Sequence, residues 1–431
     1  VICLGSKSPT IERRPRSLKC KPRIALSGVA RLCAWLAFRL LLLFNWAPSV
    51  TARSLQHSIF PFVAMQSLLS TMLGFAAVLV YADHGMRGAV VFAAVVLTVI
   101  MLGVCAPLVA GRWLRFTPAG LVRVAFLLPG LALFWAAGHI EWLALVVGGF
   151  MGLTWGARHW LELSLLEDAQ RDRYATTAST TAVLSSLVGS LIAAAVLSGS
   201  GESAKILYWA YALMALWGAW WAPRKLPVLS PLGLVSLRTV ASQPSYWRTL
   251  PLYFLESGMW GMAMVLGASG AVRSLGAASH FGWVTSMATV LGAFALYALR
   301  KQRHGGNRVR WMGMAALGMA LAHAALGASI WWAGFFVMHL LTQAVAQPFW
   351  MASEQVLNQR ALDLQGAITD RVVLRELTLW TLRLATLGVF WATVHDWPWE
   401  RTLVLGSAFM VLVTLLEWLV GSYWLRAERH Q

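Results

Sequence analysis

The chain is 431 residues long; 58% of its residues are hydrophobic and only 12% are charged. A water-soluble domain needs a larger charged surface, so this composition excludes a soluble protein and indicates an integral membrane protein. The formal net charge of +18 does not indicate nucleic-acid binding, because the Lys and Arg residues lie in short loops between apolar runs and form no continuous basic groove.

The first segment, 1–53, is predicted to be a basic leader. Its polar beginning is rich in Lys and Arg, and its apolar part at 30–46 is interrupted by Arg31 and Arg39. A central Arg costs about 2.5–3.5 kcal/mol on insertion, so an interfacial helix is expected rather than a span. A cleaved signal peptide is the alternative, against which Arg39 and the absence of a clear cleavage site argue.

Twelve apolar runs long enough to cross a ~30 Å hydrocarbon core follow the leader. They fall at roughly 57–81, 87–110, 118–138, 141–161, 176–198, 204–222, 249–270, 279–299, 310–330, 331–352, 372–394 and 402–425. The sequence therefore predicts an all-α polytopic membrane protein with two six-helix bundles. The expected divisions are a bundle at 54–222, a connector at 223–248, a second bundle at 249–426 and a tail at 427–431.

The charges in the loops give an independent test of this count. Cytoplasmic loops hold an excess of Lys and Arg, and the alternate predicted loops here are rich in them. The outward loops keep only Arg87, Lys205, Arg273 and Arg401. Both termini and the connector are therefore predicted to be cytoplasmic, in a bacterial inner or plasma membrane.

The two halves contain similar segments, which indicates an internal duplication. FPFVAMQS around Gln66 resembles LPLYFLES around Glu256, and WGARHWLE beginning at Trp155 corresponds to QPFWMASE beginning at Gln347. Two related bundles that rock against each other expose one central site to the two sides of the membrane in turn. This organisation is typical of a transporter.

Twelve spans, two similar halves and a central connector resemble the major facilitator superfamily over residues 54–426. The loops GRWLRFTPAGLVR and RKQRHGGNRVR, with Gly111 and Arg112 in the first, lack the acidic residue that the family often has there. The resemblance is that of a divergent member. It implies a cavity lined mainly by the first, fourth, seventh and tenth helices.

Those helices carry polar or aromatic side chains, several of them at the four-residue spacing of one helix face. Packing contacts between helices are an alternative role for them, especially for Ser and Thr. The predicted cavity residues are Gln66, Thr71, Thr154, Trp155, Arg158, Glu256, Trp260, His339, Gln343, Gln347, Trp350 and Arg383.

Two charged residues well inside predicted spans are candidates for function. Glu256 is about two turns into its helix, where an intramembrane acid is expected to be functional and could carry the proton that drives transport. Arg383 could bind an anionic substrate, or it could pair with Glu256 or Glu376. Trp155, Trp260 and Trp350 could instead stack on an aromatic substrate.

A further charged group is predicted near the cytoplasmic ends of three helices. Ion pairs there could hold an inward gate shut, although ordinary interfacial charges are the alternative. The gate residues are Arg158, Glu162, Glu354, Arg375 and Glu376.

The predicted function is a secondary transporter of a small organic solute that works by alternating access and is coupled to protons. No phosphate-binding Gly-rich motif supports ATP hydrolysis, and the pattern of Cys and His predicts neither metal nor cofactor. The alternatives are a non-transporting membrane assembly or receptor and, with less support, a polytopic membrane enzyme. The expected partners are the lipid bilayer, the solute and protons.

Overall fold

The computed structural model describes residues 50–136, 139–299 and 307–427. The predicted leader, apart from 50–53, and the predicted tail, apart from residue 427, lie outside the described residues. The side chains of a few residues within helices, Glu256 among them, also lie outside the description.

The described residues form helices and contain no β-strand, which confirms the predicted all-α fold class. The helices of the first half are α2 (Val50–Leu114), α3 (Pro118–Ala136), α4 (Ile140–Leu165), α5 (Asp168–Ser200) and α6 (Ala204–Trp221), followed by the 3₁₀ turn η1 (Ala222–Lys225). After the connector helix α7 (Leu237–Ala241) come α8 (Pro244–Ser257), α9 (Trp260–Leu275), α10 (Ala278–Leu299), α11 (Arg308–Ala328), α12 (Gly334–Ala361), α13 (Ile368–Val394) and α14 (Trp399–Ala427).

The first two predicted spans are joined without a loop. Gly85 has φ 62° and ψ −159°, a combination essentially restricted to glycine, and it reverses the chain inside α2. The predicted seventh span is instead divided into α8 and α9, because the helix is interrupted by a turn at Gly258 and Met259. The remaining predicted spans each correspond to one helix whose ends lie within about ten residues of the prediction.

Seven helical segments of the described part are long and apolar enough to cross a membrane, and the first, Ser58–Gly111, contains two of the predicted spans. Helices α4, α6 and α12 are also long, but their charged, amide, Trp or Tyr residues lower their mean hydropathy. Large apolar side chains such as Leu131, Leu213 and Leu321 are exposed on the outside of the bundle, as expected for surfaces that face lipid.

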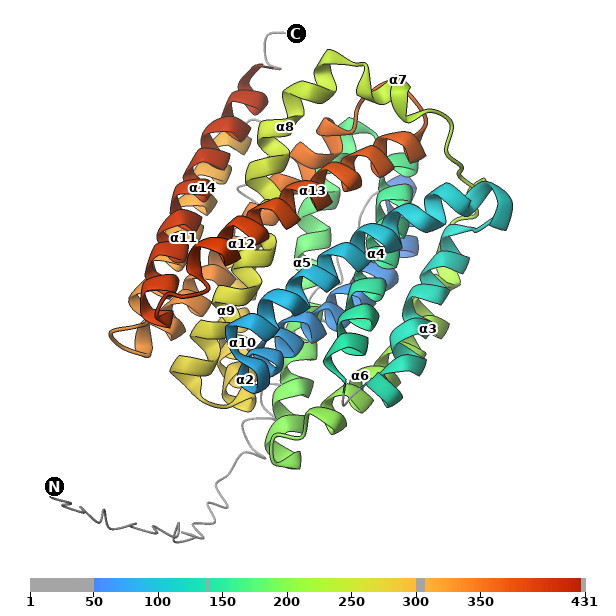
Figure 1. Cartoon of the computed structure of the whole chain (residues 1–431). Coiled ribbons are helices and arrows are strands. Elements are labelled where there is room, and N and C mark those ends of the chain that lie inside the picture. Colours follow the sequence, from blue (N-terminus) through green and yellow to red (C-terminus); the bar gives the residue numbers. More distant parts are fainter. Residues whose placement is uncertain (1–49, 137–138, 300–306, 428–431) are drawn as a thin grey trace, which may run out of the picture.

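The helices pack first within each half and then across the centre. In the first half α2 packs on α4 and α3 on α6, and in the second α11 packs on both α12 and α14. The halves meet where α5 contacts α10 and α12, and where α2 contacts α9 and α13 (Figure 1).

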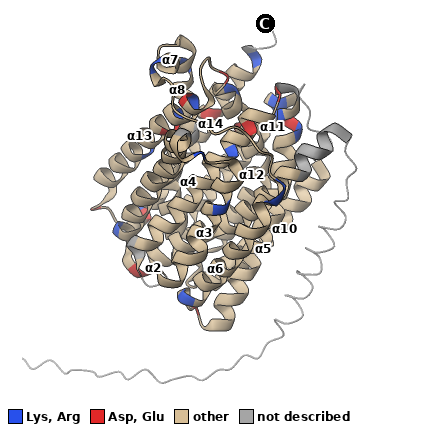
Figure 2. Cartoon of the chain, turned by 90° about the vertical axis from the view of Figure 1, so that its right-hand side faces the viewer, with Lys and Arg blue, Asp and Glu red and all other residues tan. Residues whose placement is uncertain are grey.

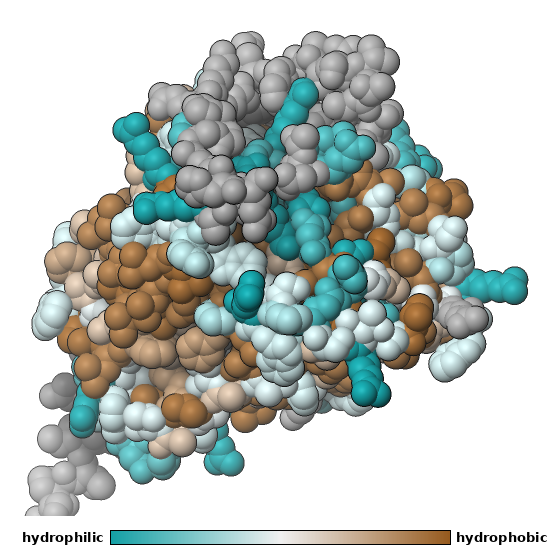
Figure 3. Space-filling model, turned by 90° about the horizontal axis from the view of Figure 1, so that it is seen from above, coloured by the Kyte–Doolittle hydropathy of each residue, from teal (hydrophilic) through white to brown (hydrophobic). Residues whose placement is uncertain are grey.

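Charged residues gather at one end of the molecule. This charged end carries α7, the α4–α5 and α12–α13 connections and the end of α14, at the top of Figures 1 and 2. The opposite end carries the α5–α6 and α9–α10 connections. Seen from the charged end, hydrophobic surface lies on the flanks of the bundle, and hydrophilic residues gather nearer its centre (Figure 3).

Candidate functional site

A cavity of about 510 Å³ lies between the two halves. Its described lining comes from α2, α4 and α5 of the first half and from α8, α9, α10, α12 and α13 of the second. This volume is within the range of about 300–1,000 Å³ that is typical of sites for small organic ligands. The cavity can therefore hold a solute in contact with both halves.

Eight of the twelve predicted cavity residues line this space. The duplicated segments meet there, because Ser67 of α2 and Ser257 of α8 both contribute to the wall, as do Trp155 and Gln347. Glu256 precedes Ser257 in α8, but its side chain lies outside the described residues. The eight residues are Gln66, Thr71, Trp155, Arg158, Trp260, Gln343, Gln347 and Arg383.

Three predicted cavity residues lie elsewhere. Thr154 is fully buried, and its hydroxyl donates to the carbonyl of Phe150 in the preceding turn. His339 is buried, with Nδ1 2.8 Å from the carbonyl oxygen of Ala322 in α11. Trp350 packs in an apolar cluster. These three residues are therefore absent from the described lining of the cavity, and a role in binding stays a prediction for them.

One ion pair organises the first-half wall of the cavity. Arg158 Nε donates to Glu162 Oε1 over 2.7 Å, one helical turn along α4. Arg158 Nη1 also makes a long hydrogen bond of 3.5 Å to Gln66 Oε1. From α12 in the other half, Gln355 Nε2 donates to Glu162 Oε1 over 2.9 Å and Gln359 Nε2 donates to Oε2 over 3.1 Å. The carboxylate of Glu162 therefore joins the two halves.

A second ion pair lies on α13. Arg375 Nη1 donates to Glu376 Oε1 over 2.7 Å, and Arg375 Nη2 donates to Asn358 Oδ1 of α12 over 2.7 Å. Arg383 Nη1 is 4.0 Å from Glu376 Oε2, so Glu376 lies between two guanidinium groups. His159 of α4 faces this pair, with Nε2 3.5 Å from Arg375 Nη1 and 3.9 Å from Glu376 Oε1.

Aromatic rings accompany a guanidinium on each side of the cavity. The Arg158 guanidinium lies 5.0 Å from the ring centre of Trp155, and that of Arg383 lies 5.3 Å from the ring centre of Trp260. Cation–π attraction at these distances helps to hold both partners in place.

The five predicted gate residues separate into two groups. Arg158, Glu162, Arg375 and Glu376 line the cavity itself. Glu354 is partly buried on α12 but is absent from the described lining.

At the charged end, residues near the beginning of α5 join the first half to the second. Arg171 Nη2 donates to Asp363 Oδ1 over 2.7 Å, and the neighbouring Asp172 accepts from Arg308 Nε over 2.9 Å. Both bonds cross between the halves. The Asp370 carboxylate accepts from the backbone N–H groups of Val235 and Ser236 in the connector.

At the opposite end the two halves are in close contact. A Cβ added at Gly282 of α10 would lie only 2.8 Å from Cβ of Ala194 on α5. Phe75 packs edge-on against Phe281, with ring centres 5.4 Å apart. A hydrogen bond of 3.0 Å from Ser286 Oγ to Ser190 Oγ also joins α10 to α5.

Sequence analysis missed several polar residues of the lining. On α12 the four-residue stripe of Gln343 and Gln347 continues through Met351 to Gln355 and Gln359. The prediction followed Trp350 and Glu354 instead, one position away from this face. His159 was also missed, although it lies beside Arg158 in the chain. Extending the four-residue spacing would have found both glutamines.

Neither protein-family profiles nor curated proteins match the chain. Solved structures do. The human organic anion transporter MFSD10 (TETRAN) superposes with a TM-score of 0.57 at 16% identity, over 85% of this chain and 99% of that one. The proton:xylose symporter XylE, described as a major facilitator superfamily protein, superposes with a TM-score of 0.55 at 14% identity, over 84% and 96% of the two chains. The chain has the major facilitator fold.

A third similar structure is a bacterial homologue of the iron transporter ferroportin in an outward-facing state. It superposes with a TM-score of 0.53 at 14% identity, over 86% of this chain and 98% of that one. At such low identities these likenesses carry the fold and no residue role. Among the described residues no group of three or more His, Cys, Asp or Glu side chains is placed to hold a metal ion.

Proposed function

We propose that the protein is a secondary active transporter that moves a small organic solute across the membrane by alternating access. The observation that carries this proposal is the cavity of about 510 Å³ lined by both halves, with cross-half contacts toward each end. Breaking one set of contacts while keeping the other would open the site to one side at a time. The similar structures include an anion transporter and a sugar symporter, which supports a solute carrier.

The inward gate is proposed to be held by contacts between Glu162 and Gln355 and between His159 and the Arg375–Glu376 pair. These groups lie on α4 of one half and on α12 and α13 of the other. Separation of the halves at the charged end would therefore break them together. The charged end is proposed to face the cytoplasm of an inner or plasma membrane, because the loops rich in Lys and Arg lie there.

Proton coupling is assigned to Glu256. Glu256 is the last residue but one of α8 and directly precedes Ser257. The Ser257 side chain lines the cavity and accepts a hydrogen bond from Arg383 Nε over 3.1 Å. A carboxyl group at this depth can bind a proton when the site faces one side and release it when the site faces the other.

Uptake into proteoliposomes tests both parts of the proposal. We expect wild-type vesicles to accumulate at least one of a panel of labelled sugars, amino acids, carboxylic acids and amides, with faster uptake under an inward proton gradient. Glu256→Gln should retain exchange of that solute but lose the stimulation by the gradient. Glu167→Gln, at an exposed position before α5, is the matched control and should behave as wild type.

The possible failures separate the two parts. Gradient stimulation that persists in Glu256→Gln would remove the coupling role and leave transport intact. Absence of uptake for every solute would favour a non-transporting membrane assembly or receptor.

A further inference from the structure

Two amide groups in the cavity are oriented by the same ion pair. Gln66 Oε1 faces Arg158, and Gln359 Nε2 donates to Glu162. A guanidinium only donates hydrogen bonds and a carboxylate only accepts them, so neither amide can be turned around without losing its contact. The ion pair therefore determines which atom of each amide remains free to bind another group: Nε2 of Gln66 and Oε1 of Gln359.

The two remaining amide ends have no hydrogen-bond partner within the described structure. Gln66 Nε2 and Gln359 Oε1 are both buried, and the residues are 2% and 4% exposed. Both residues line the cavity. Buried polar atoms are nearly always paired, so an unpaired donor and an unpaired acceptor in one cavity indicate a bound group that supplies the complementary pair.

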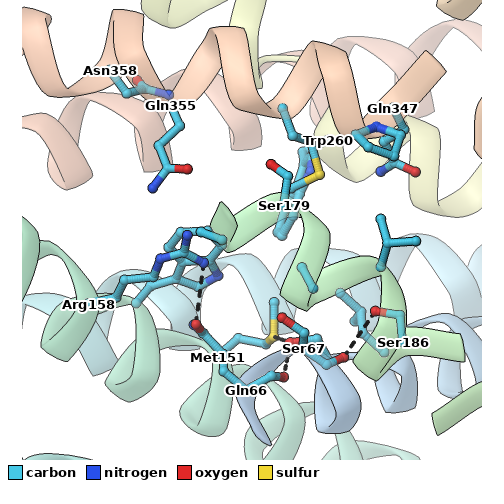
Figure 4. Close-up of a pocket in the computed structure, with 18 of the residues that line it drawn as sticks. Gln66, Ser67, Met151, Arg158, Ser179, Ser186, Trp260, Gln347, Gln355 and Asn358 are labelled. Carbon is cyan, nitrogen blue, oxygen red and sulfur yellow. Dashed lines mark hydrogen bonds between the residues drawn. The ribbon is translucent and has the colours of Figure 1, made fainter. Parts of the chain in front are cut away.

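The two amides belong to different halves. Gln66 lies on α2, and Gln359 lies on α12 with Gln355 and Asn358. Figure 4 shows Gln66 and Arg158 on one side of the pocket and Gln355 and Asn358 reaching in from the other. A group bonded to both amides would touch both halves.

The remainder of the cavity has a different character. Apart from the other charged, amide and aromatic side chains already described, its wall consists of aliphatic side chains and Met, with a few Ser and Thr hydroxyls. Such a surface suits an apolar body. Residues of this kind in the lining are Leu73, Ile100, Met151, Val183, Leu340 and Met351.

We propose that the solute is amphipathic, with an uncharged polar head that carries a hydrogen-bond acceptor beside a donor, as in a primary carboxamide, and an apolar body. The head accepts from Gln66 Nε2 and donates to Gln359 Oε1. This inference rests on the proposed transport function and names the chemical class of its cargo.

Charged heads complement this pair less well. A carboxylate offers only acceptors and leaves Gln359 Oε1 unpaired, whereas an ammonium offers only donors and leaves Gln66 Nε2 unpaired. The two charges that orient the amides neutralise one another, because Arg158 pairs with Glu162. An uncharged head satisfies both amides and preserves this balance.

Binding of four ligands with one body tests the proposal. The probes are phenylpropanamide, its N,N-dimethylamide, phenylpropanoate and phenylpropylamine, measured by calorimetric titration of the full chain in detergent. We expect the primary amide to bind about 5- to 100-fold more tightly than each of the others, since each of these leaves one buried polar atom unpaired.

Two variants identify the partners of the head. In Gln359→Leu the preference for the primary amide over the dimethylamide should disappear, because the acceptor for the ligand N–H is gone. In Gln66→Leu both amides should weaken by about fivefold or more, while the preference between them persists. Gln170→Leu is the matched control, since this glutamine is exposed near the beginning of α5 and is absent from the described lining. Thermal unfolding of each variant verifies that it is folded.

Equal binding of the two amides, tightest binding of the carboxylate or the amine, or an equal effect of Gln170→Leu would overturn the inference. Because binding is measured without flux, these outcomes are separate from the transport assay. Amide-selective binding without uptake would leave the inference standing and overturn the proposed function instead.

Discussion

At the charged end of the bundle the halves are joined by ion pairs, whereas at the opposite end they are joined by close packing. Arg171 and Asp172 reach Asp363 and Arg308 through charged hydrogen bonds. Gly282 instead brings α10 against Ala194 of α5 with no room for a side chain. Charged contacts respond to solvent and to charge reversal, while packed contacts respond to volume. The two proposed gates of the cavity should therefore be separable by experiment.

The largest effect is expected from added volume at the opposite end. Gly282→Leu would push α5 and α10 apart, and overpacking of this kind costs about 1–3 kcal/mol. We expect uptake to fall by about tenfold, and a cysteine introduced at Ser190 to become more accessible to a membrane-impermeant thiol reagent.

Gly267→Leu is the matched control for this prediction. A Cβ at Gly267 of α9 meets no neighbour within 4 Å, so the larger side chain should leave uptake unchanged. Equal loss of uptake in the two variants would show that the close approach at Gly282 does not seal this end.

Charge reversal at the charged end should have an intermediate effect. Arg171→Asp places a carboxylate opposite Asp363, and we expect uptake to fall several-fold because like charges replace an ion pair. The double variant Arg171→Asp with Asp363→Arg should recover most of the activity, since the pair is restored with its signs exchanged. If the double variant is no more active than Arg171→Asp, the pair does not hold this end closed.

Ionic strength should have the smallest effect. The Debye length falls from about 8 Å at 0.15 M salt to about 3 Å at 1 M, which weakens partly exposed ion pairs but leaves packing contacts almost unchanged. Asp363 has a side chain that is 47% exposed, so its contact with Arg171 should be sensitive to salt. We expect about a twofold increase in thiol labelling at the charged end in 1 M salt and none at the opposite end. Equal changes at the two ends would contradict the comparison.

The sequence was sufficient to predict the helical fold because each span needs a long apolar run and basic residues mark alternate loops. It also placed Gln66, Gln343 and Gln347 on the cavity, where the four-residue spacing follows one helix face. The rotation of each helix about its own axis is set by tertiary packing, so the sequence could not show that Thr154 and His339 lie outside the described lining. Their polar atoms contact backbone carbonyls instead.

Contacts between distant segments could not be predicted in the same way. The hydrogen bond from Gln359 to Glu162 joins residues 197 positions apart, and no local pattern identifies either as the partner of the other. The division between α8 and α9 was missed because Gly258 alone is compatible with a continuous membrane helix.

The reversal at Gly85 has a mechanical consequence. Since a single residue connects the two arms of α2, the arms have no slack and should move as one stiff hairpin. One arm carries Gln66 in the cavity, and the other carries Thr98, whose hydroxyl accepts from Trp380 Nε1 of α13 in the other half. A movement of the arm that carries Gln66 would therefore also move the arm that contacts α13, without a separate chain of side-chain contacts between them.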